Sequence, residues 1–166
     1  MKITAVGLGL IGGSMCKAIK KHTNHTVYGI DINKETIEMA LSQNAIDAET
    51  DDLGIADITI VSLYPTDTID YIISNADKFK EGSIVVDTCG IKKEVVDRVT
   101  PVLEKYGVTF IGAHPMAGRE FSGFEYSLDK AISMNPENIT VHTLALKRSS
   151  NLVTDKKEIL AGDVAS

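Results

Sequence analysis

The chain has 166 residues, 43% of them apolar and 24% charged, as expected of a globular domain with one hydrophobic core. Its net charge of −6 and the absence of a basic stripe argue against a general nucleic-acid binder. Its two cysteines have no metal-ligand or disulfide spacing, so we expect no metal site. No apolar run resembles a membrane span or a signal peptide, so we expect no membrane contact and a cytoplasmic location.

A glycine-rich turn follows the first predicted strand, residues 3–6. Its glycines have the spacing G-x-G-x-x-G: the first permits a tight turn, the second lets backbone approach a pyrophosphate, and the third lets the next helix pack close to the strand. The N–H groups and positive dipole end of that helix favour phosphate oxygens. We therefore predict a dinucleotide site, with a purely structural turn as the alternative. The residues expected to contact the cofactor here are Gly7, Gly9, Leu10, Ile11 and Gly12.

An aspartate ends the second predicted strand, residues 26–30, about 20 residues past the glycine motif. The Asp31 carboxylate can accept hydrogen bonds from a ribose 2'-OH and repel a 2'-phosphate, so it predicts NAD as the cofactor rather than NADP. The alternative is that Asp31 caps the next helix, because Asn33 and Glu35 follow it.

Strands and helices alternate along the rest of the chain. This pattern predicts an α/β fold with a doubly wound, Rossmann-like parallel sheet, right-handed crossovers and the strand order 3-2-1-4-5-6. The further strands are expected near 46 and at 57–63, 84–87 and 108–111, and the helices after the second strand at 34–44, at 66–78 and from about 91. We expect Pro101 to begin a separate turn or second helix that ends near Tyr106.

The first helix is expected to have an apolar face formed by Met15, Ala18 and Ile19, and Cys16 is expected to pack against the first strand. In this fold the cofactor lies at the carboxyl ends of the strands. The residues after the fourth and fifth strands are therefore further expected cofactor contacts, namely Ser62, Leu63, Tyr64 and Thr88.

The pattern supports an NAD-binding domain over residues 1–127 and an atypical C-terminal extension over residues 128–166. The extension contains one predicted strand, at 139–144, and a polar end. It is too short to bury a core of its own, so we expect it to pack on the domain edge or to be partly disordered.

The loop at 112–127, GAHPMAGREFSGFEYS, places His114 just past the last predicted strand of the sheet, where substrate would lie beside the nicotinamide. A histidine there can take a proton from a hydroxyl as hydride leaves the same carbon. For a lone histidine the structural alternative, capping a neighbouring carbonyl, is preferred. His22, His25 and His142 are assigned that structural role.

Three features together, the GLGLIGGS loop, Asp31 and GAHPMAGREFSGFEYS, resemble the nucleotide-binding domain of prephenate dehydrogenases, the tyrosine-biosynthesis family that includes arogenate dehydrogenases. The resemblance implies oxidative decarboxylation of prephenate to 4-hydroxyphenylpyruvate, or of arogenate to tyrosine, with NAD as oxidant and His114 hydrogen-bonded to the ring hydroxyl. It also implies a small-molecule substrate and a homodimer. The substrate-binding residues that it implies are Gly118, Arg119 and Glu120; for Arg119, a substrate carboxylate and a solvated loop position remain equal alternatives.

The sequence departs from the family pattern in two places. Where the family often has Asp-x-Gly-Ser-Val-Lys, residues 87–92 read DTCGIK, so Gly90 replaces a serine that supports the histidine; Thr88, Cys89 or a water is expected to take its place. The family's helical dimerisation domain has no counterpart in these 166 residues. Two alternative functions therefore remain: an NAD-binding module without turnover, and another NAD-dependent oxidoreductase of the 3-hydroxyacid type.

Overall fold

A computed structural model of the chain describes residues 1–115, 123–127 and 141–142. The expected substrate residues Gly118, Arg119 and Glu120 lie outside the described residues, as does all of the predicted extension at 128–166 except residues 141–142.

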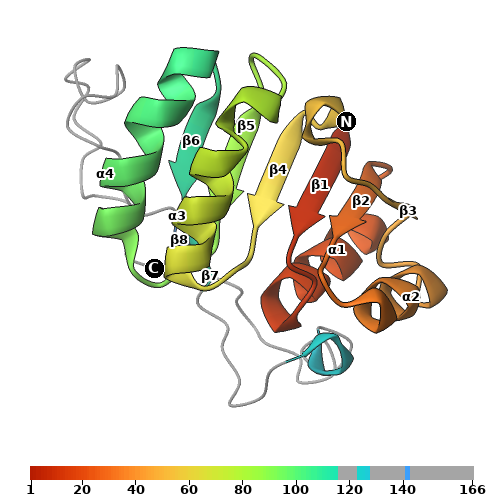
Figure 1. Ribbon diagram of the computed structural model, residues 1–166. Helices are drawn as coiled ribbons and strands as arrows, with labels where there is room; N and C mark the ends of the chain where they lie inside the picture. Colours follow the sequence, from red (N-terminus) through yellow and green to blue (C-terminus); the bar gives the residue numbers. More distant parts are fainter. Residues whose placement is uncertain (116–122, 128–140, 143–166) are drawn as a thin grey trace, which may run out of the picture.

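Six parallel strands form one sheet in the order β3-β2-β1-β4-β5-β6, which confirms the predicted doubly wound topology (Figure 1). Short apolar, β-branched runs bounded by polar or glycine residues form the central strands, as expected for strands buried on both faces. The strand order reverses between β1 and β4, which is the place where such folds bind ligands. The strands are β1 Lys2–Val6, β2 Thr26–Ile30, β3 Ala48–Glu49, β4 Ile58–Val61, β5 Ile84–Asp87 and β6 Thr109–Gly112.

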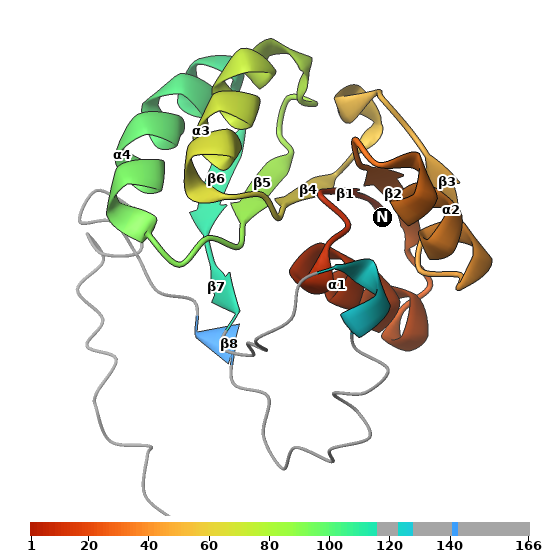
Figure 2. The same ribbon diagram turned by 60° about the horizontal axis from the view of Figure 1, so that its bottom comes forward.

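Two helices cover each face of the sheet (Figure 2). One buried cluster lies under α3 (Pro65–Ser74) and α4 (Lys92–Leu103), and a second lies under α1 (Leu10–His22) and α2 (Lys34–Ser42). Each fully buried Val or Ile contributes about 1.5–3 kcal/mol of transfer free energy. The 3-10 turns are η1 Leu53–Ile55, η2 Ala76–Lys78, η3 Glu104–Tyr106 and η4 Phe124–Tyr126.

The buried face of α1 differs from the one expected. Gly12, Gly13 and Cys16 are buried, whereas Met15 and Ala18 are only partly covered. The small residues face the sheet because they let the helix axis lie close to β1. Cys16 packs in the same cluster as Ala5 of β1, as predicted, and burial raises the pKa of its thiol to about 12.

The aromatic ring of Phe124 fills the place that a side chain at position 13 would occupy. A Cβ at Gly13 would lie 2.5 Å from Phe124 Cδ2, and Phe124 belongs to the core cluster beneath α1 and α2. The Lys17 Nζ lies 4.7 Å from the ring centroid, within reach of a cation–π interaction. Turn η4 therefore packs on α1 (Figure 2), although β6 lies at the far edge of the sheet.

The predicted break at Pro101 is wrong. Helix α4 continues through Pro101 to Leu103 and then tightens into η3, and Gly107 follows with φ 68°. Proline removes one backbone N–H donor, but here it does so in the last turn, so few helical hydrogen bonds remain to be disrupted. The brief third strand, expected near Ile46, lies at Ala48–Glu49, and Ile46 itself is buried in the core.

A short antiparallel pair lies beyond the main sheet. It joins β7 (His114–Pro115) to β8 (Val141–His142), and β8 falls within the strand predicted at 139–144. Among the described residues, no helix combines the length and the hydropathy that a bilayer crossing requires.

Candidate cofactor and active site

The first position of the loop requires glycine for two reasons, its backbone conformation and the lack of space for a side chain. Gly7 has φ +81°, a region that side chains rarely adopt, and a Cβ there would lie 2.6 Å from the Ser62 carbonyl oxygen. Its N–H donates to the Ile30 carbonyl at 2.8 Å. The turn is therefore held between the carboxyl ends of β2 and β4.

The other two glycines of the motif meet opposite conditions. A Cβ at Gly12 would lie 1.9 Å from the Gly7 carbonyl oxygen, so only glycine lets α1 begin this close to the turn. At Gly9 a Cβ would meet nothing within 4 Å. No described side chain caps the start of α1, and its first turn has no acidic residue. Open space beside an uncapped helix start fits a pyrophosphate group.

The Asp31 carboxylate joins the glycine loop to the end of β2. It accepts the Leu8 N–H at 2.7 Å and the Asn33 N–H at 2.9 Å. Asn33, and not Asp31, caps α2, because its side chain accepts the Glu35 N–H at 2.9 Å. The alternative of Asp31 as the cap is therefore wrong. A carboxylate has about four lone-pair sites, which leaves acceptor capacity for a ribose hydroxyl.

A fully exposed isoleucine follows Asp31, and the sequence analysis did not single it out. Ile32 has a relative exposure of 103%. An apolar side chain in water at the carboxyl edge of the sheet, next to a candidate ribose acceptor, offers a surface for a flat aromatic base. The only sequence signal for it is an apolar residue placed between two polar ones.

The end of β4 forms the opposite wall of the glycine loop. The side chain of Leu63 would lie 2.8 Å from a Cβ at Gly7, and the Tyr64 side chain is exposed. The Ser62 hydroxyl is buried, and within the part of the chain that the structure describes it has no hydrogen-bond partner. Ser62 and Leu63 therefore shape the loop, and Tyr64 is open to a ligand.

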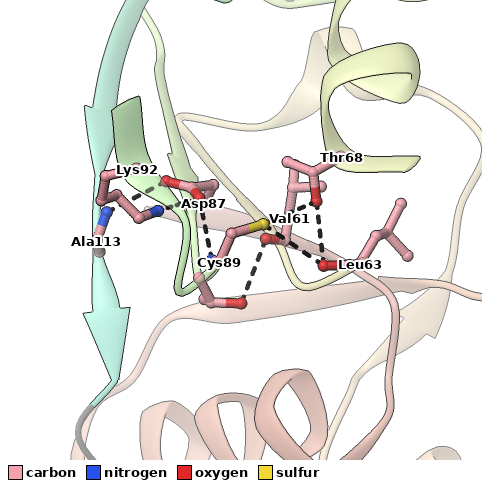
Figure 3. A network of polar contacts seen from close by, with 8 residues as sticks. Val61, Leu63, Thr68, Asp87, Cys89, Lys92 and Ala113 are labelled. Atoms are coloured by element: carbon pink, nitrogen blue, oxygen red, sulfur yellow. Dashed lines mark hydrogen bonds and ion pairs between the residues drawn. The ribbon is translucent and has the colours of Figure 1, made fainter. Parts of the chain in front are cut away.

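The thiol of Cys89 is directed toward the end of β4 and α3, and the hydroxyl of Thr88 is directed toward β4. Cys89 Sγ lies 3.2 Å from Thr68 Oγ1 and 3.6 Å from the Leu63 carbonyl, and burial raises the pKa of this thiol (Figure 3). The buried Thr88 hydroxyl donates to the Val61 carbonyl at 3.5 Å. Both side chains thus form their contacts toward β4 and not toward His114, so neither takes the place of the serine that Gly90 replaces.

His114 lies against the loop that follows β5. A Cβ at Gly90 would be 3.6 Å from His114 Nε2 and 3.9 Å from Cε1, and the imidazole is exposed. The structure thus brings together Gly90 and His114, as expected, at the same edge of the sheet as the glycine loop. Over residues 1–115, 123–127 and 141–142, no group of three or more His, Cys, Asp or Glu side chains is arranged to hold a metal ion.

A buried ion pair beneath this loop was not anticipated. Asp87 ends β5 and Lys92 begins α4, and their side chains form an ion pair (Figure 3). The signal available in the sequence was an acid and a base five residues apart at a strand end, which is too common to single out.

The chain matches the sequence family described as "Prephenate dehydrogenase, nucleotide-binding domain" over residues 15–141. It is 34% identical over 128 residues to a prephenate dehydrogenase of Lactococcus lactis subsp. cremoris, covering 74% of this chain and 36% of that protein. The fold is similar to that of prephenate dehydrogenase from A. aeolicus in complex with hydroxyphenyl propionate and NAD+, with a TM-score of 0.70, 30% identity and coverage of 78% of this chain and 46% of that one. It is also similar to Synechocystis arogenate dehydrogenase, with a TM-score of 0.70, 25% identity and coverage of 77% and 45%. The chain thus spans about a third of the length of the Lactococcus relative that it matches.

Proposed function

The chain belongs to the prephenate dehydrogenase family, and from this premise we propose that it binds NAD and takes part in the oxidative decarboxylation of prephenate or arogenate. One observation carries the proposal: the His114 imidazole lies beside the loop after β5, at the edge of the sheet where the glycine turn and Asp31 also lie. The groups proposed to bind the cofactor and to handle the proton therefore lie at one edge of the sheet.

NAD fits the residues present. The first turn of α1 would hold the pyrophosphate near Gly9, Asp31 would accept the ribose hydroxyls, and Ile32 would contact the adenine. When bound, the nicotinamide supplies the acceptor for one hydride.

In the proposed reaction the substrate ring loses a hydride and carbon dioxide and becomes aromatic. His114 would accept a hydrogen bond from the ring hydroxyl and support the charge that develops on its oxygen as the C–H bond breaks. The electrons of the bond to the ring carboxylate complete the aromatic ring, so no further oxidant is required. The protein's main task is then to position the ring and this one proton.

NADH formation by the purified chain, with NAD and with prephenate or arogenate in parallel assays, tests the proposal. Turnover with one substrate supports it and identifies that substrate. Turnover of a 3-hydroxyacid alone would support the other oxidoreductase class. NAD binding without turnover of any of these substrates would support the binding-module alternative.

Replacing Asp31 with alanine is expected to reduce the preference for NAD over NADP by about tenfold or more, corresponding to about 1.4 kcal/mol or more. The change removes both the ribose acceptor and the charge that repels a 2'-phosphate. The Kd values of the two cofactors, measured by calorimetry, check it. Asn33→Ala is the matched control, since it removes the α2 cap, costs about 1 kcal/mol of stability and leaves the ratio unchanged. An unchanged ratio in Asp31→Ala would exclude the ribose role.

Replacing Gly90 with serine is expected to raise kcat about fivefold, because a hydroxyl there would reach His114 Nε2 and a hydrogen bond contributes about 1 kcal/mol. The new Cβ would be at an ordinary contact distance, 3.6 Å from that nitrogen, so the fold should be retained. Gly90→Ala adds the same Cβ without the hydroxyl and should give no gain. Equal effects of serine and alanine would rule out a role for the hydroxyl.

We also propose a cytoplasmic location and a homodimer. Both cysteines, Cys16 and Cys89, are free and buried, which suits a reducing compartment. Sedimentation of the purified chain would test the dimer, and cell fractionation would test the location.

A further inference from the structure

A buried ion pair joins the end of β5 to the start of α4. The side chain of Asp87 is 0% exposed and that of Lys92 is 16% exposed. Removing two charges from water is costly, so a buried pair of this kind requires compensating hydrogen bonds. The partners of Asp87 show what the pair holds in place (Figure 3).

The two oxygens of Asp87 hold two different segments. Oδ2 accepts the Cys89 N–H at 3.0 Å and the Lys92 ammonium, and it thus fixes the loop after β5. Oδ1 accepts the N–H of Ala113, the residue before His114, at 3.2 Å. The same N–H also donates to the Asp87 backbone carbonyl at 3.2 Å, so the end of β6 retains one hydrogen bond if the side chain changes.

The alkyl chain of Lys92 lies against the end of β6. A Cβ at Gly112 would be 3.2 Å from Lys92 Cδ and 3.2 Å from Val96 Cγ2. The lysine therefore occupies the space that a side chain two residues before His114 would need.

The loop that Asp87 and Lys92 flank also lies close to the imidazole, since a Cβ at Gly90 would lie 3.6 Å from His114 Nε2. The ion pair thus acts on His114 in two ways, through the backbone that precedes the histidine and through the loop beside its ring. We propose that Asp87 and Lys92 are positioning residues that fix the His114 imidazole at the edge of the sheet. The effect on turnover rests on the proposed function; the effect on the position of His114 does not.

The test uses a double variant, Asp87→Asn with Lys92→Met, in the full chain. Removing both charges avoids leaving one buried and unpaired. An amide has one acceptor oxygen where a carboxylate has two, so either the Cys89 N–H or the Ala113 N–H loses its side-chain acceptor.

Two measurements are made on each variant. The first is the positions of two NMR signals, that of the Ala113 amide and that of the His114 Cε1–H. The spectrum of His114→Asn identifies the second signal, because the ring proton is then absent. The second is kcat together with the KM for NAD. We expect both NMR signals to shift or broaden and kcat to fall about 10- to 100-fold, as for a misplaced catalytic group, with the KM for NAD unchanged.

The control is Lys80→Met, which breaks the Lys80–Asp57 ion pair (2.6 Å) at the amino end of the same sheet. It should leave the His114 signals and kcat as they are. If a folded double variant keeps the wild-type signals of Ala113 and His114, or if Lys80→Met shifts them equally, the pair has only a structural role and the proposal is wrong.

A second variant decides the matter if the double variant does not fold. Gly112→Ala keeps both charges but displaces Lys92 from its contact with β6. Shifted His114 signals would support the proposal, and unshifted signals would overturn it. If the wild-type chain shows no turnover, the proposed function fails while the NMR signals still decide the positioning role.

Discussion

Replacing His114 with asparagine lowers kcat by about 10²–10⁴-fold, the usual loss when a general acid–base group is removed, and leaves the Kd for NAD unchanged. Asparagine keeps a polar side chain of similar reach but cannot take a proton at neutral pH. The imidazole lies beside Gly90, past the end of β6, whereas the glycine loop follows β1, so the two functions are expected to separate. Steady-state NADH formation and calorimetric titration with NAD measure them independently.

His22 provides the matched control, because it ends α1 and is exposed. His22→Asn should retain full turnover. If His114→Asn keeps the wild-type kcat, His114 is a structural loop residue and the chemistry needs another group.

Replacing Gly12 with alanine abolishes detectable NAD binding and destabilises the fold by about 1–3 kcal/mol, the range typical of overpacking. The new Cβ would be placed 1.9 Å from the Gly7 carbonyl oxygen, a backbone atom that cannot rotate away. The sign of the stability change is diagnostic, since glycine to alanine within a helix ordinarily stabilises by about 1 kcal/mol. Thermal unfolding with and without NAD gives both quantities.

Gly9→Ala is the companion variant. Its Cβ meets nothing within 4 Å, so the loss of stability should not exceed about 1 kcal/mol, the cost of a poorer N-cap residue. Its NAD affinity should nevertheless fall about tenfold or more, which is about 1.4 kcal/mol, because the methyl group occupies the space left for the pyrophosphate. Wild-type affinity in Gly9→Ala would mean that the cofactor does not approach this backbone.

Local rules were sufficient for the glycine turn and the strand order. The positive φ of Gly7 and the close approach of Gly12 to the Gly7 carbonyl arise within a few residues of chain, and the strands at 26–30 and 84–87 are apolar runs with clear boundaries. Their alternation with helices fixes a parallel sheet, because parallel strands need crossover connections.

Long-range contacts decided what the sequence left open. Asp31 was the candidate for the α2 cap, but its carboxylate accepts the Leu8 N–H, from another segment, and Asn33 caps the helix instead. At Pro101, the free energy gained by burying the side chains of Val99 and Leu103 exceeds the cost of one missing helical hydrogen bond. No local pattern distinguishes such outcomes, since each depends on a partner brought close by the fold.

The contact between Phe124 and Gly13 has a consequence for how the protein is made. During synthesis, the first two strands and α1 emerge long before residue 124, yet their core lacks the ring that fills the space over Gly13. Closing so long a loop costs conformational entropy, and the contact that compensates for this cost forms only late in folding. The N-terminal βαβ unit therefore lacks part of its core until late in synthesis, and α1 reaches its final packing only after residue 124 has left the ribosome.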